Sequence, residues 1–546
     1  MTTTPKLWVR LPLGALSGLL AGFAALAVAQ LVSAAVRPEA GPITAVGGAA
    51  IDRTPTPVKD WAIRHFGEND KAVLQLGIVA TLAVLALVLG VLALRFRRAG
   101  AAGVLLFGVI GGAAAVTRPD ASGFADALPS VAGAVVGAAL LYFLIGRLTV
   151  SARPGRADTG SDQAAGADQD AGPDQGSGPD HGAGWDRRGF VMAAVGAAAA
   201  SVGIGALGRH LTGNVSQAAI ASRKAVRLPA PASPAPALPA GTQLATPGIS
   251  AFTTSNKAFY RVDTALVVPK VNADTWRLRI HGKGVSRPVT LTFDDLLQRE
   301  LIERDITLTC VSNEVGGPYV GNARWLGVRL ADVLSEAGVR PPSKGGPADQ
   351  LVSRSVDGMT LGTPVETVMD GRDAMLVVGM NGQPLPFTHG FPVRMLVPGL
   401  YGYVSACKWI EDIELTTFAD YDAYWVKRDW AEKAPIKTQS RIDTPQPLVR
   451  LKRGTVMVAG VAWAQHRGID RVQVRVDDGP WQDAELAAEA NIDTWRQWSF
   501  AWKATPGSHT LTARATERGG DVQTEKRTGT VPDGASGWPS VVVTVD

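Results

Sequence analysis

Cysteine and charge are the two features that this sequence has least of. Only two cysteines, Cys310 and Cys407, occur in 546 residues. Two thiols this far apart form neither a disulfide framework nor a CxxC metal site, although they could still pair with each other. The chain must therefore be stabilised by packed apolar cores, and either thiol could be free for chemistry.

Charged residues make up 19% of the chain, and its formal net charge is +5. No block of lysine and arginine with interleaved aromatic residues occurs, so the sequence gives no support to nucleic-acid binding. The length also exceeds that of one ordinary domain. We therefore expect several domains and no nucleic-acid partner.

Long apolar runs dominate residues 1–150. They lie at Leu11–Val36, Ala72–Leu94, Ala101–Val116 and Leu128–Leu148. A helix needs about 20 apolar residues to cross a bilayer, and lipid cannot satisfy the polar groups of any irregular backbone. The third run is the shortest and is rich in glycine and alanine. The pattern predicts an N-terminal helical transmembrane bundle of four helices over residues 1–150.

None of the seven histidines lies within these four runs, and acidic and basic residues are missing from the middle of each run. Ligation of a haem by two histidines inside the bundle is therefore excluded. Because ionisable groups within a membrane usually mark functional sites, their lack favours an anchor or a packing role. Transfer of electrons to a quinone or to a partner protein is the alternative.

Basic residues in the short loops indicate which side of each run faces the cytoplasm. One side carries Lys6, Arg10, Arg95, Arg97, Arg98, Arg147, Arg153 and Arg156. The loop from Arg37 to Lys71 on the other side is also basic, but its charges are dispersed and partly offset by acidic residues. We therefore expect both chain ends of the four-helix region to be cytoplasmic.

Three segments of distinct composition follow. Residues 151–186 are predicted to be a flexible acidic linker, since Trp185 is their only large apolar residue. Residues 187–210 begin with Arg187 and Arg188 ahead of an apolar segment, which predicts a fifth transmembrane helix. Residues 211–250 are rich in proline and predict an extended stalk. The fifth helix would lead out of the cytoplasm, making this a multi-pass cell-membrane protein with an extracytoplasmic soluble half.

The soluble half changes character near residue 445. Residues 251–444 mix strand patterns such as "TWRLRIHG" and "AMLVVGMNG" with amphipathic helix patterns, "TFDDLLQRELIE" and "RLADVLSEAG". This mixture predicts an α+β domain. Residues 445–546 alternate apolar and polar residues between Gly, Asp and Pro turns. They predict an immunoglobulin-like β-sandwich that lacks the antibody-type disulfide.

Two stretches of the α+β domain could carry chemistry. Cys310 ends a β-branched strand, and its thiol could be a nucleophile with His389 as base, a soft metal ligand or an inert buried group. A second stretch brings His389, Arg394 and Lys408 together among Gly and Pro turns. Arginine offers a fork of donors and lysine a point charge, which favours an anionic ligand over a merely exposed basic loop.

Together these stretches resemble the sulfite oxidase family of molybdopterin-dependent oxidoreductases, in the form of a membrane-anchored bacterial, actinobacterial-type member. "LTCVSN" matches the strand-Cys-x-x-Asn context of that family's molybdenum ligand, and "MNGQPLPFTHGFPVRMLVPGLYGYVSACKW" matches a second signature. "GVAWA", "DDGPWQDAEL" and "PGSHTLTARATERGG" resemble the family's second domain, usually called its dimerisation domain. The resemblance covers the chain from about Ala251 to its end.

The resemblance implies a molybdenum–molybdopterin cofactor with Cys310 as the metal ligand. Cofactor contacts would come from Asn256, Tyr260, Arg261, Thr363, His389, Arg394, Ser405 and Lys408. The implied activity is oxo transfer beside Cys310 on a small molecule, with Arg261 or Lys408 holding an anionic substrate or the pterin. It also implies an electron-transfer partner and a homodimer through the C-terminal domain.

Two departures from the family pattern concern the substrate. Trp430 in "WVKRDW" stands where animal and plant sulfite oxidases have a catalytic tyrosine, and "RVDTALVVP" replaces a shorter segment that contains a histidine. Sulfite and another small oxo-substrate, such as a sulfoxide, both remain open. So do two other functions: a binding module that keeps the cofactor fold without turnover, and a hydrolase that uses Cys310 and His389.

The resemblance also bears on Arg187 and Arg188. Molybdopterin is inserted in the cytoplasm, so its domain must fold before export, and twin-arginine signals serve that route. "DRRGFVM" resembles such a signal. We predict insertion of the first four helices by the general secretion machinery and of the fifth by the twin-arginine machinery. A plain fifth helix, whose arginines only mark its cytoplasmic end, is the alternative.

Overall fold

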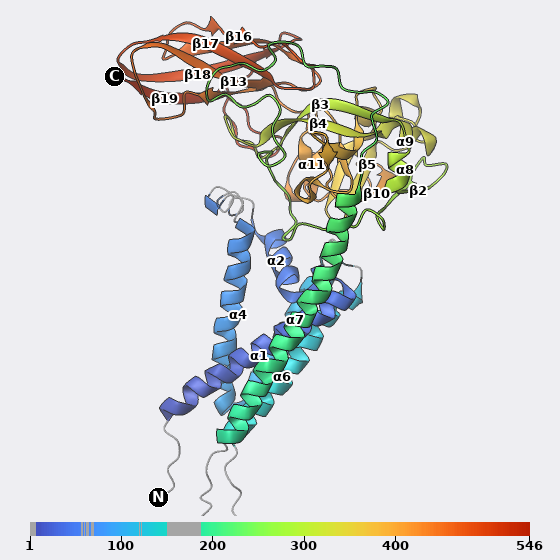
Figure 1. Ribbon diagram of the computed structural model, residues 1–546, viewed down its shortest axis with the longest axis vertical. Coiled ribbons are helices and arrows are strands. Elements are labelled where there is room, and N and C mark those ends of the chain that lie inside the picture. The colour runs from blue at the N-terminus through green and yellow to red at the C-terminus, as the bar shows by residue number, and fades with distance from the viewer. Residues whose placement is uncertain are drawn as a thin grey trace, which may run out of the picture. The chain divides into compact units, whose positions relative to one another are not determined.

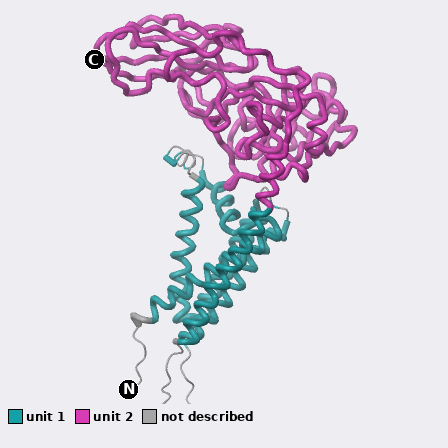
Figure 2. Tube along the Cα trace, in the orientation of Figure 1, with its two compact units in different colours: residues 1–214 teal, residues 215–546 magenta. Residues whose placement is uncertain are grey.

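The computed structural model describes residues 7–55, 70–118, 123–149 and 187–546, with isolated positions at 58, 61, 65, 66 and 121. The predicted acidic linker lies outside the described residues and stays a prediction. The chain divides into two compact units, residues 1–214 and residues 215–546 (Figure 2).

The first unit is helical. Its helices are α1 (Leu7–Val36), α2 (Pro42–Arg53), α4 (Asp70–Arg95), α5 (Arg97–Val116), α6 (Leu128–Thr149) and the first part of α7 (Arg187–Ala225) (Figure 1). Among the described residues, five of these helices are long and apolar enough to cross a membrane, which is consistent with membrane anchoring. The transmembrane assignment itself stays a prediction. The short helix α2 was not predicted. Helix α7 continues beyond the expected end at residue 210, because residues 211–225 contain no proline and several good helix formers.

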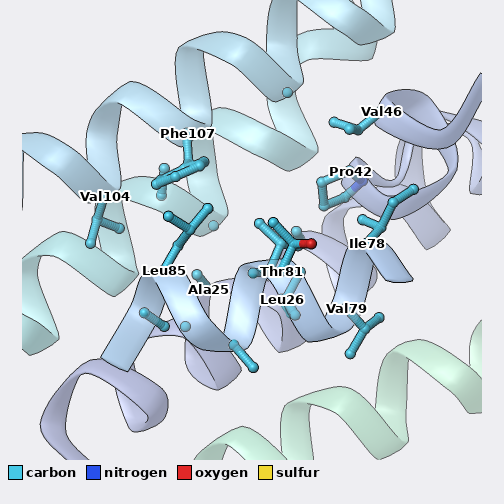
Figure 3. Close-up of a pocket in the computed structure, with 18 of the residues that line it drawn as sticks. Ala25, Leu26, Pro42, Val46, Ile78, Val79, Thr81, Leu85, Val104 and Phe107 are labelled. Atoms are coloured by element: carbon cyan, nitrogen blue, oxygen red, sulfur yellow. The ribbon is translucent and has the colours of Figure 1, made fainter. Parts of the chain in front are cut away.

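Glycine allows the membrane helices to approach closely. A Cβ atom at Gly18 of α1 would lie 1.9 Å from the carbonyl oxygen of Ala86 on α4, so only glycine fits there. Asp126, just before α6, is fully buried and pairs with Arg37 at 3.1 Å. A cavity of about 820 Å³ lies among α1, α2, α4, α5 and α6, with Leu26, Ile78 and Phe107 among its apolar lining residues (Figure 3).

The second unit begins with a proline-rich strap rather than a separate stalk, which corrects the expectation for residues 226–250. Ser233 donates to the carbonyl oxygen of Leu301 at 3.2 Å and accepts from the amide of Glu303 at 2.9 Å. Leu244 donates from its amide to Gln497 Oε1 at 2.6 Å. The strap therefore bonds both the edge of an α+β sheet and the C-terminal strands. Its few backbone donors find partners there instead of facing water.

Two sheets form the α+β part. One has the order β2-β1-β10-β5-β6 and the other the order β3-β4-β7-β8, with β9 paired to β7. The strands are β1 (Arg277–Gly282), β2 (Val289–Thr292), β3 (Leu301–Thr309), β4 (Val320–Arg329), β5 (Gln350–Ser355), β6 (Thr360–Pro364), β7 (Met375–Met380), β8 (Gln383–Pro384), β9 (Arg394–Leu396) and β10 (Ile410–Thr416). Short helices α8 (Phe293–Leu297), α9 (Leu330–Glu336), α10 (Val365–Val368) and α11 (Gly402–Ser405) connect them.

The predicted helix "TFDDLLQRELIE" is only half right. Thr292 and Asp295 form a capping box that starts α8, but the helix ends at Leu297. From Leu301 the chain is strand β3, which pairs with β4 along its whole length. Nine paired residues with a mostly buried pattern outweigh a local helical period, because strand preference depends on the neighbours that pack against it. The strand patterns "TWRLRIHG" and "AMLVVGMNG" are confirmed as β1 and β7.

The C-terminal strands form two sheets around one apolar core. Their orders are β11-β13-β17-β16 and β12-β19-β18-β14-β15. The strands are β11 (Gln439–Thr444), β12 (Arg450–Leu451), β13 (Gly454–Trp463), β14 (Ile469–Val476), β15 (Gln482–Asp483), β16 (Glu485–Leu486), β17 (Arg496–Ala504), β18 (Gly507–Glu517) and β19 (Ser540–Val545). Val458, Val472 and Trp498 are fully buried in this core. Because β11 pairs with β13, this part begins before the expected boundary at residue 445.

Candidate functional site

Cys310 follows the last residue of β3 and is 8% exposed. Its amide donates to the carbonyl oxygen of Tyr319 at 2.9 Å, and its carbonyl oxygen accepts from the amide of Asn313 at 3.1 Å. Burial raises the pKa of the thiol, although hydrogen bonds from Ser312 and the charge of Lys408 oppose that shift. The thiol is therefore held neutral until a positive centre binds it, as a metal would.

Arg394 begins strand β9 and is a buried cation, 5% exposed. Its Nη1 donates to the carbonyl oxygen of His389 at 3.4 Å, and its guanidinium lies 5.2 Å from the centre of the Trp325 ring. Its Nε finds no hydrogen-bond partner among the described residues. Burial lowers the pKa of this guanidinium to about 10. An orphaned buried donor on a cation fits an anionic group.

His389 lies in a short 3-10 turn, Phe387–His389, directly before the loop that leads to Arg394. Its Nε2 is 2.9 Å from the carbonyl oxygen of Asn256, so Nε2 must carry the donated proton. Burial, together with the charges of Arg394, Lys408 and Arg261, lowers the pKa of this histidine to about 4. The ring is neutral at pH 7 and keeps Nδ1 as an acceptor.

The Asn256 side chain belongs to the same wall of the site. Its Nδ2 donates to the carbonyl oxygen of Met380 at 3.3 Å, and its Oδ1 accepts from Asn381 Nδ2 at 2.8 Å. Tyr260 stacks on Phe259, which also contacts His389 edge to face. The pKa of Tyr260 is raised, because burial and the neighbouring Cys310 thiol both oppose ionisation of its hydroxyl. Tyr260 is thus close enough to both Cys310 and Arg394 to be influenced by each.

Asp263 is a residue of this site that the sequence reasoning missed. Its Oδ2 accepts from Lys408 Nζ at 2.8 Å and from Arg261 Nε at 2.9 Å, and its side chain is 3% exposed. Lys408 also donates to the carbonyl oxygen of Val262 at 3.1 Å. A signal was present: two cations proposed for one site need a counter-charge, and an aspartate stands two residues after Arg261.

Thr363 and Ser405 hold the scaffold. The Thr363 hydroxyl donates to the carbonyl oxygen of Val404, and the Ser405 hydroxyl lies 3.0 Å from each of the carbonyl oxygens of Leu400 and Tyr401. Both side chains are fully buried. Both hydroxyls donate their protons to backbone carbonyl oxygens of the loop before Lys408. In this respect Thr363 and Ser405 differ from the other predicted site residues.

The second cysteine, Cys407, lies within electrostatic reach of Arg394. Cys407 is 1% exposed, burial raises its pKa to about 12, and both cysteines are free thiols. Trp430 is buried against Tyr403 and Trp425, and its Nε1 has no hydrogen-bond partner in the described part of the chain. The hydrolase alternative gains no support, because no hydrogen bond joins Cys310 and His389 among the described residues, and the Nε2 proton of His389 is directed to Asn256.

Comparison with known proteins gives this cluster a context. Residues 265–425 match the family described as the oxidoreductase molybdopterin binding domain. The mitochondrial sulfite oxidase of Rattus norvegicus is 31% identical over 293 residues, 46% of this chain and 53% of the relative. The mitochondrial sulfite oxidase of Homo sapiens is 30% identical over 318 residues, 50% of this chain and 57% of the relative. The chain spans about half the length of these curated relatives.

A solved structure, the sulfane dehydrogenase SoxCD from Paracoccus pantotrophus, is 23% identical to this chain. It covers 54% of this chain and 84% of its own length with a TM-score of 0.47. A likeness at that score settles no property of the site. The matched domain and its sulfite oxidase relatives establish molybdenum–molybdopterin as the cofactor of this domain.

Proposed function

We propose that this chain, whose soluble half belongs to the sulfite oxidase family of molybdopterin-dependent oxidoreductases, is a membrane-anchored enzyme that transfers an oxygen atom to or from a small substrate. The observation that carries this proposal is that a buried thiol, Cys310, and a buried cation, Arg394, both lie within electrostatic reach of Tyr260, and that Arg394 Nε lacks a partner among the described residues. One group suits a soft metal and the other a phosphate.

The remaining residues support that assignment. Neutral His389 offers Nδ1 as an acceptor, while Tyr260, Arg261 and Lys408 add donors and charge beside it. The cofactor supplies the two-electron redox chemistry when it is bound. The chain's own residues hold it, keep the thiol shielded from water until the metal is present and place positive charge where anionic groups must lie.

The place of the enzyme in the cell forms a second part of the proposal. Five apolar helices support attachment to the cell membrane, and helix α7 begins at Arg187. We infer export of the soluble half by the twin-arginine route after cofactor insertion, so that it works on the extracytoplasmic side. The two C-terminal sheets would form an immunoglobulin-like domain able to dimerise. A quinone or a redox protein would exchange electrons with the cofactor.

The metal assignment is tested on the full chain purified in detergent. Wild type should contain one molybdenum per chain, with a molybdenum–thiolate signal in electron paramagnetic resonance, whereas Cys310→Ser should lose that signal. Cys407→Ser is the matched control, because it changes a buried thiol that is not proposed as a ligand. Identical signals in wild type and Cys310→Ser would refute the assignment.

The export route is tested separately by replacing Arg187 and Arg188 with lysine. Charge is kept, so a plain fifth helix should still insert, while a twin-arginine signal should fail. We expect a molybdenum-loaded soluble half that stays accessible only from the cytoplasm. Normal exposure of the double variant on the outer side would exclude the twin-arginine route.

A further inference from the structure

The last turns of helix α7 belong to the second unit, although the same helix begins as the proposed fifth span. Helix α7 covers Arg187–Ala225 without a break, and the second unit begins at Val215. Ser222 is buried, and its hydroxyl oxygen accepts from the amide of Ala273 at 3.2 Å. Ala219, one turn earlier, is fully buried. The end of α7 is therefore packed into the α+β part.

Arg223, in the last turn of α7, binds two consecutive carbonyl oxygens of the α+β part. Its Nε donates to the carbonyl oxygen of Leu385 at 2.6 Å, and its Nη2 donates to that of Pro384 at 2.7 Å. Pro384 ends strand β8, and the amide of Leu385 donates to the Val378 carbonyl oxygen of β7 at 3.1 Å. A planar fork of charged donors suits two neighbouring acceptors. Arg223 thus holds the end of the β7–β8 hairpin.

The residues held by Arg223 lead directly into the turn that carries His389. The next residue, Pro386, accepts through its carbonyl oxygen from the amide of His389 at 2.9 Å and from that of Phe391 at 3.3 Å. The ring of His389 is fixed at its other side by the carbonyl oxygen of Asn256. Because Arg223 fixes the start of this turn, a shift at that point would rotate the ring away from its place in the site.

We propose that Arg223 is a positioning residue of the cofactor site, through which the end of helix α7 fixes the His389 ring. The proposed fifth span is then a structural part of the site as well as an anchor. The contacts of Arg223 are with the chain itself, so its effect on the turn is independent of the proposed function. Only its effect on the cofactor rests on that function.

The test is hydrogen–deuterium exchange of the full chain in detergent, with and without molybdenum. In Arg223→Ala the amides of Leu385, His389 and Phe391 should exchange about tenfold faster than in wild type, because two charge-assisted hydrogen bonds no longer oppose local opening. The amides of strand β17 in the C-terminal sheets should exchange as in wild type. A local change of this kind separates positioning of the turn from general stabilisation.

Two measurements make the test specific to the guanidinium group. Guanidinium ion at millimolar concentration should restore slow exchange in Arg223→Ala, whereas an equal concentration of potassium chloride should not. Arg223→Lys should lie between wild type and Arg223→Ala, because an ammonium group has no planar fork of donors. Arg227→Ala is the matched control and should leave exchange unchanged, since Arg227 donates to carbonyl oxygens of residues 224–226 in its own segment.

The effect on the cofactor is measured on the same variants. In the molybdenum-loaded chain, Arg223→Ala should release molybdenum on dialysis about tenfold faster than wild type, a size typical of residues that orient the contacts of a metal site. Arg227→Ala should release it at the wild-type rate.

Four results would overturn the inference. They are unchanged exchange at Leu385 and His389 in Arg223→Ala, a uniform rise in exchange over the whole soluble half, equal effects of Arg227→Ala, and release of molybdenum from Arg223→Ala at the wild-type rate. If Arg223→Ala fails to fold, the same amides in Arg223→Lys decide. A wild type without molybdenum would instead refute the proposed function, and the exchange measurements would still decide the role of Arg223.

Discussion

The two units of this protein each bury an aspartate against arginine, but they do so in opposite surroundings. In the helical unit, Asp126 is fully buried and pairs with Arg37 next to helices that approach closely at glycines. In the soluble unit, Asp263 joins two cations that act on a thiol and a histidine. The same type of ion pair, an aspartate with an arginine, stabilises helix packing in the first unit and adjusts the charge of a reactive site in the second.

The two units differ in whether a partly or fully buried arginine has a carboxylate partner: Arg37 pairs with Asp126, whereas Arg394 forms no ion pair among the described residues. Arg394 has a buried Nε without a partner in the described residues, a cost that folding alone does not explain. A buried cation of this kind is tolerated where a bound ligand supplies the missing hydrogen-bond acceptor. In the helical unit, Arg37 has a carboxylate partner in Asp126, which agrees with a structural role.

The largest expected effect is a loss of stability in the helical unit alone. Gly18→Leu would place a side chain where a Cβ already lies 1.9 Å from the Ala86 carbonyl oxygen, so α1 and α4 must separate. We expect a loss of about 3 kcal/mol or more in the stability of the bundle. Thermal unfolding in detergent measures that loss, while molybdenum content in the soluble half should stay unchanged.

Gly77→Leu is the control for that variant. A Cβ atom at Gly77 meets nothing within 4 Å, and this residue lines the apolar cavity between the helices. Its stability should stay within about 0.5 kcal/mol of wild type. Equal losses in the two variants would show that close backbone approach is not what holds α1 to α4.

The next largest expected effects come from two substitutions that should change the free energy of unfolding in opposite directions. Arg37→Met takes the arginine from a fully buried carboxylate and should destabilise the bundle by about 3 kcal/mol. Arg394→Met removes a buried cation that lacks its ligand, so the cofactor-free soluble half should gain about 1–3 kcal/mol. Denaturation of protein from a host that makes no molybdopterin measures both changes.

The same Arg394→Met variant made with cofactor present should lose most of its molybdenum, because the phosphate partner is gone. We therefore expect Arg394→Met to be more stable than wild type when the cofactor is absent, and to hold less molybdenum than wild type when the cofactor is present. Destabilisation of the cofactor-free form would mean that Arg394 serves packing, in the way that Arg37 serves the bundle.

The effect that is absent at neutral pH and develops only in acid is the pH dependence due to His389. Its folded pKa of about 4 lies below the ordinary value of 6.5, so the unfolded chain binds more protons between these values. The stability that the neutral ring contributes is therefore complete above pH 6.5 and is lost as the pH falls towards 4, by up to about 3 kcal/mol. Acid denaturation followed by tryptophan fluorescence should show this slope.

His389→Gln keeps a donor for the Asn256 carbonyl oxygen but cannot titrate, so the contribution of this histidine should disappear from the slope. No comparable change is expected from His281→Gln, since His281 pairs with Asp412 on a sheet surface. An unchanged slope in His389→Gln would place the acid sensitivity in another group.

The sequence predicted this protein well wherever a local pattern decides the structure. The apolar runs become long helices, as their length and composition predict. The alternating strands of the C-terminal part also appear, with Trp498 and Val472 directed into the core. Cys310, His389, Arg394 and Lys408 could be selected because two compact motifs carry them.

Tertiary structure decided what depends on residues far apart in the chain. It turned "RELIE" into part of a strand, bound the proline-rich segment to Leu301 and Gln497, and gave the Thr363 and Ser405 hydroxyls to backbone carbonyls. It also set Asp263 against Lys408, 145 positions along the chain. Local sequence sets the period of an element, but pairing, burial and counter-charges are set by partners that only the fold brings together.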